Sequence, residues 1–133
     1  MSDYNSQYSG ARIEELLAMI PNLAKADLSN AMTVSWGAIG YAKFNNGLLI
    51  QWGKKTSIGN YQGTIYLPLS FYDNNYSLSI GSEKGNVTDN SSWIANFVNK
   101  TASSFNYIDT YTINGQSGTS SASFDWIAIG RWK

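Results

Sequence analysis

The alternation of apolar and polar positions predicts one helix near the start of the chain. Between residues 11 and 20, apolar side chains recur at offsets of 0, 3, 4 and 7, which is the spacing of one helical stripe. Ser9 is a suitable N-cap, and Pro21 disfavours helical backbone in the residue before it. The stripe consists of Ile13, Leu16, Leu17 and Ile20.

From Trp36 onward, the pattern changes to short apolar stretches separated by Gly, Asn, Asp and Ser, which is typical of β-strands. An Asn-Asn-Gly turn at 45–47 predicts a hairpin, because Asn and Gly tolerate the positive φ angles of tight turns. Pro68 has no N–H to donate, so its strand should lie at a sheet edge or end there. The expected strands are 41–44, 48–52, 65–71, 76–80, 93–98, 105–113 and 124–129.

Short strands at turn spacing, with no helix between them, predict an all-β fold, an antiparallel β-sandwich preceded by a short N-terminal α-helix. A small barrel is the alternative architecture. We expect a helix and connector over 1–35, with 21–35 as the connector, and a β domain over 36–133.

Two apolar surfaces in this arrangement need a cover. A helix of about ten residues is marginal in water unless its stripe is buried, either on its own β domain or against other copies of the chain. The last strand has apolar residues on both faces, so it should be a central strand or an interface strand. The predicted oligomer interface therefore contains Ile13, Leu16, Leu17, Ile20, Trp126, Ile127 and Ile129.

Composition excludes several classes of function. The chain has no Cys and no His, which removes Cys/His zinc sites, haem ligation, disulfides and His-activated nucleophiles. Nine basic residues balance nine acidic ones, so we expect neither nucleic acid nor an anionic membrane surface as a partner. No apolar run is long enough for membrane insertion, and the first ten residues do not resemble a signal peptide. We expect no metal and no cofactor.

The carboxylates of the β region do not form a catalytic motif, and we expect the protein not to be an enzyme. They are Asp73, Glu83, Asp89, Asp109 and Asp125. A glycosidase-like pair can still be assembled by the fold, so a glycan-degrading enzyme remains an alternative.

Three blocks of the β region resemble the C-terminal domain of phage tail fibre proteins. Residues 41–53, YAKFNNGLLIQWG, are similar to the family pattern YxKFPNGLIIQWG, although Asn45 replaces the usual Pro. Residues 64–71, TIYLPLSF, are similar to its TVxFPIxF strand, and residues 124–130, FDWIAIG, to its terminal FxWIAIG. Arg131 and the trailing Trp132 and Lys133 depart from the aromatic end that is common in the family.

The resemblance implies a β-sandwich of H-type lectin character, a homotrimer, and a role in attaching the virion to a glycan or glycoprotein on a bacterial surface. The location would be the virion tail fibre, or the cytoplasm of a bacterium carrying the prophage before release. The helix could also hold other tail proteins. A ligand-free trimerisation cap and a lectin outside a phage remain alternatives, as do a separate tip, a whole short fibre and a prophage remnant.

The matched blocks are strands and a turn, so receptor contacts are expected in the segments between them, chiefly 83–93 and 114–121. Amides and carboxylates there can bond hydroxyl groups, and aromatic rings can stack on a sugar. The candidate ligand-binding residues are Asp89, Asn90, Trp93, Tyr107, Tyr111, Asn114 and Gln116. The alternative interpretation places Trp93 and both tyrosines in the core.

Overall fold

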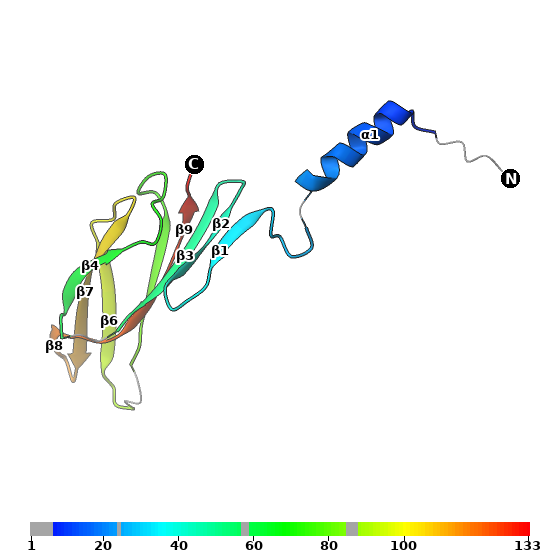
Figure 1. The fold of residues 1–133 in the computed structure, drawn as a ribbon. Helices are drawn as coiled ribbons and strands as arrows, with labels where there is room; N and C mark the ends of the chain where they lie inside the picture. The colour runs from blue at the N-terminus through cyan, green and yellow to red at the C-terminus, as the bar shows by residue number, and fades with distance from the viewer. Residues whose placement is uncertain (1–6, 24, 57–58, 85–87) are drawn as a thin grey trace.

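The protein consists of a β-sandwich and a helix that stands apart from it (Figure 1). This computed structural model describes residues 7–23, 25–56, 59–84 and 88–133. One sheet, here sheet A, has the strand order β1-β2-β3-β9-β5, and the other, sheet B, has the order β4-β7-β6 with β8 paired to β7. All the strand pairs are antiparallel, which confirms the predicted fold class.

The strand bounds place each predicted strand in a sheet. Sheet A contains β1 (Met32–Ser35), β2 (Gly40–Phe44), β3 (Leu48–Lys55), β5 (Ser77–Ser82) and β9 (Phe124–Arg131). Sheet B contains β4 (Gln62–Tyr66), β6 (Ser92–Val98), β7 (Ser104–Ile113) and β8 (Gln116–Thr119). Because β9 lies between β3 and β5, the prediction that the last strand is central is confirmed.

Two tight turns follow the expected chemistry. Residues 45–47 join β2 to β3, with Gly47 at φ 104° and its N–H donating to the Phe44 carbonyl at 3.1 Å. Asn114 and Gly115, at φ 51° and 79°, form a two-residue hairpin between β7 and β8. The second turn corrects an expectation, because the segment after it was expected to be a loop and instead forms β8.

Two segments differ from the predicted strands. The strand expected over 65–71 is β4, which lies at the edge of sheet B as predicted but ends at Tyr66, two residues before Pro68. The connector expected over 21–35 ends in a strand, because Met32 and Val34 pair with Phe44 and Ala42. Residues 32–35 are therefore part of sheet A.

The core lies between the sheets and is largely aromatic. Phe105 of sheet B meets Trp126 of sheet A edge to face, with ring centroids 5.7 Å apart, and Tyr107 meets Phe124 at 5.1 Å. The placement of Trp126 at an oligomer interface and of Tyr107 at a ligand site was wrong, because both side chains are buried between the sheets. A Cβ on Gly53 would lie 2.5 Å from the Trp126 ring, so this close packing requires glycine.

The predicted helix is α1 (Gly10–Met19), followed by one 3₁₀ turn, η1 (Ile20–Asn22), that contains Pro21. Ser9 caps α1 as expected, since its Oγ accepts a hydrogen bond from the Arg12 N–H at 3.2 Å. All residues of α1 are exposed, and the helix stands away from both sheets (Figure 1). Its apolar stripe is therefore not covered by its own β domain. No helix among the described residues is long and apolar enough to span a membrane.

Candidate functional site

The two ends of the sandwich are formed by different segments of the chain. The chain enters from α1 at the end that holds the 45–47 turn and the C-terminus (Figure 1). The opposite end, here the distal end, is formed by residues 36–39, 59–61, 83–84, 88–91, 114–115 and 120–123. The described parts of both segments that the sequence predicted for receptor contact, 83–93 and 114–121, contribute to this distal end, and residues 85–87 lie outside the described residues.

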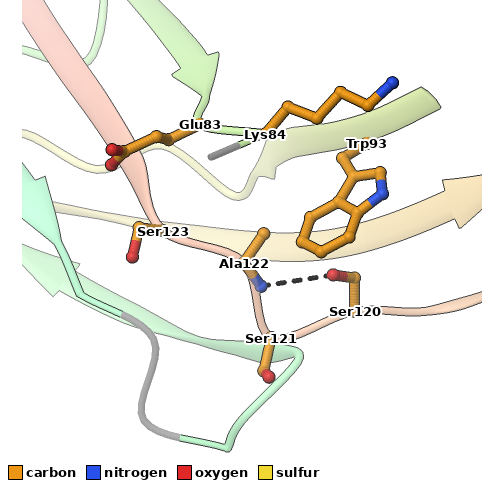
Figure 2. Close-up of a pocket in the computed structure, with 7 residues that line it drawn as sticks. All are labelled: Glu83, Lys84, Trp93, Ser120, Ser121, Ala122 and Ser123. Atoms are coloured by element: carbon orange, nitrogen blue, oxygen red, sulfur yellow. Dashed lines mark hydrogen bonds between the residues drawn. The ribbon is translucent and has the colours of Figure 1, made fainter. Parts of the chain in front are cut away.

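A pocket of about 360 Å³ opens at the distal end. Glu83 and Lys84 follow β5, Trp93 lies at the start of β6, and residues 120–123 connect β8 to β9. Figure 2 shows the Trp93 indole pointing toward Ser120 and Ala122. The pocket therefore combines residues from both sheets around one aromatic side chain.

The loop before β6 holds the Trp93 ring in place. The Trp93 Nε1–H donates to the Ser91 hydroxyl at 3.1 Å, and that hydroxyl donates in turn to Asp89 Oδ1. The Ser91 backbone N–H also donates to Asp89 Oδ1, at 2.9 Å. These bonds leave the indole with one orientation relative to the pocket.

The Asp89 carboxylate accepts hydrogen bonds from within its own loop. The hydrogen bonds from the Ser91 hydroxyl and the Ser91 backbone N–H lower the pKa of the Asp89 carboxyl, and Lys84, with its Nζ 3.5 Å from Oδ1, lowers it further. A carboxylate with these internal donors is well suited to orient Trp93. The Asp89 side chain remains 52% exposed, and its direct contact with a ligand stays a prediction.

The remaining wall of the pocket is polar. Ser120 Oγ accepts a hydrogen bond from the Ala122 N–H at 3.2 Å, drawn as a dashed line in Figure 2. Glu83 accepts one from Lys54 Nζ at 2.8 Å, and its backbone N–H donates to the Ser123 carbonyl at 2.9 Å. An indole beside hydroxyl groups and charged side chains can contact both the apolar face and the hydroxyl rim of a sugar.

The other predicted ligand residues do not line the pocket. Asn90 is exposed in the same loop as Asp89, and Tyr111 is the cross-strand partner of Trp93. Asn114 and Gln116 are exposed on the β7–β8 hairpin. Sequence reasoning did not single out Lys84 or Ser120–Ser123 as individual contacts, since serine is too common in this chain to be informative.

Among the described residues there is no cluster of three acidic side chains that could hold a metal ion. Of the described residues that line the pocket, Glu83 is the one with a carboxylate.

A second surface of interest is the outer face of sheet A. Ile127 and Ile129 on β9 are each 42% exposed, and Leu48 on β3 is also exposed. Trp36, 82% exposed, lies against Trp52 with ring centroids 5.7 Å apart. Of the residues predicted to form an oligomer interface, the two isoleucines of β9 and the α1 stripe are therefore available to a partner.

Comparison with known proteins identifies the family. The model of the family described as tail fiber protein gp53-like, C-terminal, matches residues 43–131. None of the curated proteins searched matches the chain.

Solved structures of pyocin tail fibres share the fold. An N-truncated R2-type pyocin tail fibre is 15% identical with a TM-score of 0.57, over 98% of this chain and 54% of the fibre chain. The present chain thus spans about half of that fibre. An N-truncated R1-type fibre is 16% identical with a TM-score of 0.54, over 95% of this chain and 99% of that one. A C-terminal part of the P. aeruginosa R2 fibre is 17% identical with a TM-score of 0.55, over 98% and 38% of the two chains. Because the family model covers most of the chain, the protein belongs to the gp53-like tail fibre C-terminal family.

Proposed function

We propose that the chain is the receptor-binding tip of a phage or prophage tail fibre, located in the virion tail, and that it is not an enzyme. The observation that carries this proposal is the position of the Trp93 pocket, at the end of the sandwich opposite the entry of the chain from α1. If α1 faces the rest of the fibre, the pocket points away from the virion. This is where an attachment protein meets a cell.

The chemistry of the pocket favours a bacterial surface glycan or glycoprotein as the receptor. The Trp93 face can stack on a sugar ring, while serine hydroxyls, Glu83 and Lys84 can bond its hydroxyl groups. Contacts of this kind are individually weak. Several copies of the pocket on one fibre would raise the avidity without any new contact.

We further propose that three copies associate through the outer face of sheet A and the α1 stripe. The apolar positions of that face form one continuous surface across neighbouring strands, and an identical face on each copy can be covered by closed symmetry. The stripe through Leu16 and Leu17 has no cover within its own chain. The resemblance to tail fibres favours three copies over two.

The test is binding of the fluorescently labelled chain to a panel of bacterial strains that includes the strain carrying the gene, with purified surface polysaccharide as competitor. We expect binding to one or a few strains, competed by their polysaccharide, and strongly reduced by Trp93→Ala. Tyr66→Ala is the matched control, because Tyr66 is an exposed aromatic residue on the outer face of sheet B.

Two results would contradict this function. Release of new reducing ends from the polysaccharide would favour the glycan-degrading alternative. Absence of binding to every strain, with the protein folded and oligomeric, would favour the ligand-free cap.

A further inference from the structure

One ion pair lies inside the sandwich, and none of the sequence motifs accounts for it. Lys55 at the end of β3 and Asp109 in β7 face each other between the sheets, with Nζ 2.8 Å from Oδ2. Their side chains are 4% and 2% exposed. The pair therefore links sheet A directly to sheet B within a largely aromatic core.

Both residues also bind the segments that build the distal end. Lys55 Nζ donates to the Ala122 carbonyl at 2.9 Å and to the Asn60 carbonyl at 3.4 Å. The Asp109 backbone N–H donates to the Tyr61 carbonyl at 2.6 Å.

The Asp109 carbonyl in turn accepts from the Ser120 N–H at 3.0 Å. Ser120 and Ala122 line the pocket, so two of its wall residues are tied to this pair.

Stability alone does not explain why the pair is charged. Lys55 Nζ lies 5.0 Å from the centroid of the Tyr107 ring and 5.6 Å from that of Phe124. An apolar side chain at position 55 would therefore pack against aromatic rings. Replacing a buried ion pair by apolar residues is often neutral or stabilising, because removing two charges from water is costly. Among the described residues, Asp109 Oδ1 also receives no hydrogen bond.

What the charged pair supplies, and an apolar pair cannot, is the two bonds from the Lys55 ammonium to the Asn60 and Ala122 carbonyls, with the Asp109 carboxylate holding that ammonium in place. The backbone bonds of Asp109 to Tyr61 and Ser120 then join the same two loops to β7. We propose that Lys55 and Asp109 are positioning residues that fix the 59–61 and 120–122 segments and so set the shape of the distal pocket. This inference rests on the proposed function insofar as the pocket is the receptor contact. The geometric part stands independently of any receptor.

The experiment compares the intact chain with the double variant Lys55→Met/Asp109→Leu, which removes the charges and keeps similar side-chain volume. Lys54→Met is the matched control, because Lys54 is the neighbouring residue and makes an exposed ion pair of the same length, 2.8 Å, with Glu83. Amide hydrogen exchange by NMR is measured at Ser120 and Asp109, with Trp126 and Ala128 in the core of β9 as internal references. A 5-fluorotryptophan label reports Trp93 by ¹⁹F NMR, assigned with Trp93→Phe.

We expect the double variant to unfold at a denaturant concentration close to that of the intact chain. Exchange at Ser120 and Asp109 should nevertheless accelerate about tenfold or more, with no change at Trp126 and Ala128. The Trp93 fluorine signal should shift or broaden. Lys54→Met, which removes the bond to Glu83 but keeps Lys55 and Asp109, should change none of the exchange rates.

Unchanged exchange at Ser120 in a stable double variant would overturn the proposal. If the double variant does not fold, Asp109→Asn decides, because Asn has the same shape and still offers an oxygen to Lys55. We expect a smaller acceleration at Ser120 in this variant, and unaltered exchange together with an unaltered Trp93 signal would overturn the proposal equally. A loosened pocket with unchanged cell binding would instead count against the pocket as receptor contact.

Discussion

The outer faces of the two sheets are built from different side chains. On sheet A, the strand register places apolar residues next to one another across β1, β2, β3 and β9, and polar residues are confined to its margins. The apolar residues are Met32, Val34, Ala42, Phe44, Leu48, Ile50, Trp52, Ile127 and Ile129. On sheet B, the outer face is mostly amides and hydroxyls, with Tyr66, Ile94, Ile108 and Val98 scattered among them. The polar residues are Gln62, Thr64, Asn96, Asn106, Thr110, Thr112, Ser117 and Thr119.

The difference shows that exposure of a single residue is a poor guide to its role. Ile127 on sheet A and Ile94 on sheet B are 42% and 48% exposed, so their individual exposures do not distinguish them. Only Ile127 belongs to a continuous apolar surface, and soluble monomers rarely expose such surfaces. Sheet A therefore presents its outer face to other copies, under the assembly proposed above, and sheet B presents its outer face to water.

The largest effect should come from a charge on the outer face of sheet A. We expect Ile127→Lys to convert the oligomer to monomers, because like charges brought together at an interface cost several kcal/mol. Light scattering after size exclusion measures the mass. Ile94→Lys, at nearly equal exposure on sheet B, should leave the mass unchanged. Dissociation by both variants would contradict the assignment of the interface to sheet A alone.

The next effect contrasts the inner and outer sides of sheet A at neighbouring positions. Lys55→Met should destabilise each subunit by about 3–5 kcal/mol, because it leaves the Asp109 charge buried without a partner. Lys54→Met removes an exposed pair that water screens, and it should leave the free energy of unfolding nearly unchanged. Urea unfolding at neutral pH measures both values, and equal losses would contradict the assignment of Lys55 to the interior.

A smaller effect is expected from α1. Deleting residues 1–21 removes four stripe residues, each worth roughly 1.5–3 kcal/mol at most if buried between copies. We expect the β domain to remain trimeric but to dissociate at higher protein concentration than the intact chain, as measured by sedimentation. An unchanged dissociation constant would assign α1 a different task, such as holding the rest of the fibre.

The smallest effect is a pair of opposite pH dependences. Burial raises the pKa of Asp109 above 3.8, although the hydrogen bond and charge of Lys55 oppose the shift. The stability from protonated Asp109 is therefore present below pH 3.8 and is lost as pH rises through the folded-state pKa. Measured against Asp109→Asn, the wild-type free energy of unfolding should fall with rising pH in this window.

Asp89 should behave in the opposite way, because the hydrogen bonds from Ser91 lower its pKa. The stability from ionised Asp89 is present above pH 3.8 and is lost as pH falls through the folded-state pKa. The measurement is the difference in free energy of unfolding between wild type and each variant, Asp109→Asn or Asp89→Asn, as a function of pH. If the two differences change with pH in the same direction, one of these carboxyls is placed wrongly.

The sequence predicted the elements whose signals are local. The Ser9 cap, the 45–47 turn, the edge position near Pro68 and the central last strand each depend on a few neighbouring residues, and all are confirmed. β1 was missed because a four-residue strand is too short for a pattern of alternation.

What the sequence could not supply was the choice of face. Alternation separated Trp126 and Ile127, but only the packing of the second sheet decides which of them is covered. Trp93 and Tyr107 lie on the same inner face of sheet B, and only their distance from the distal end decides that Tyr107 is in the core and Trp93 lines the pocket. Lys55 was overlooked because adjacent lysines resemble an exposed pair, and only the fold brings Asp109 next to one of them.

Association through the outer face of sheet A can be tested by hydroxyl-radical footprinting of the intact chain, which measures how accessible each aromatic side chain is in solution. Trp36 lies at the outer face of sheet A and is 82% exposed in one subunit, whereas Tyr66 lies on the outer face of sheet B and is 78% exposed. We expect Tyr66 to be oxidised rapidly, and Trp36 to be protected until Ile127→Lys separates the copies. Rapid oxidation of Trp36 in the intact chain, unchanged by Ile127→Lys, would contradict this association.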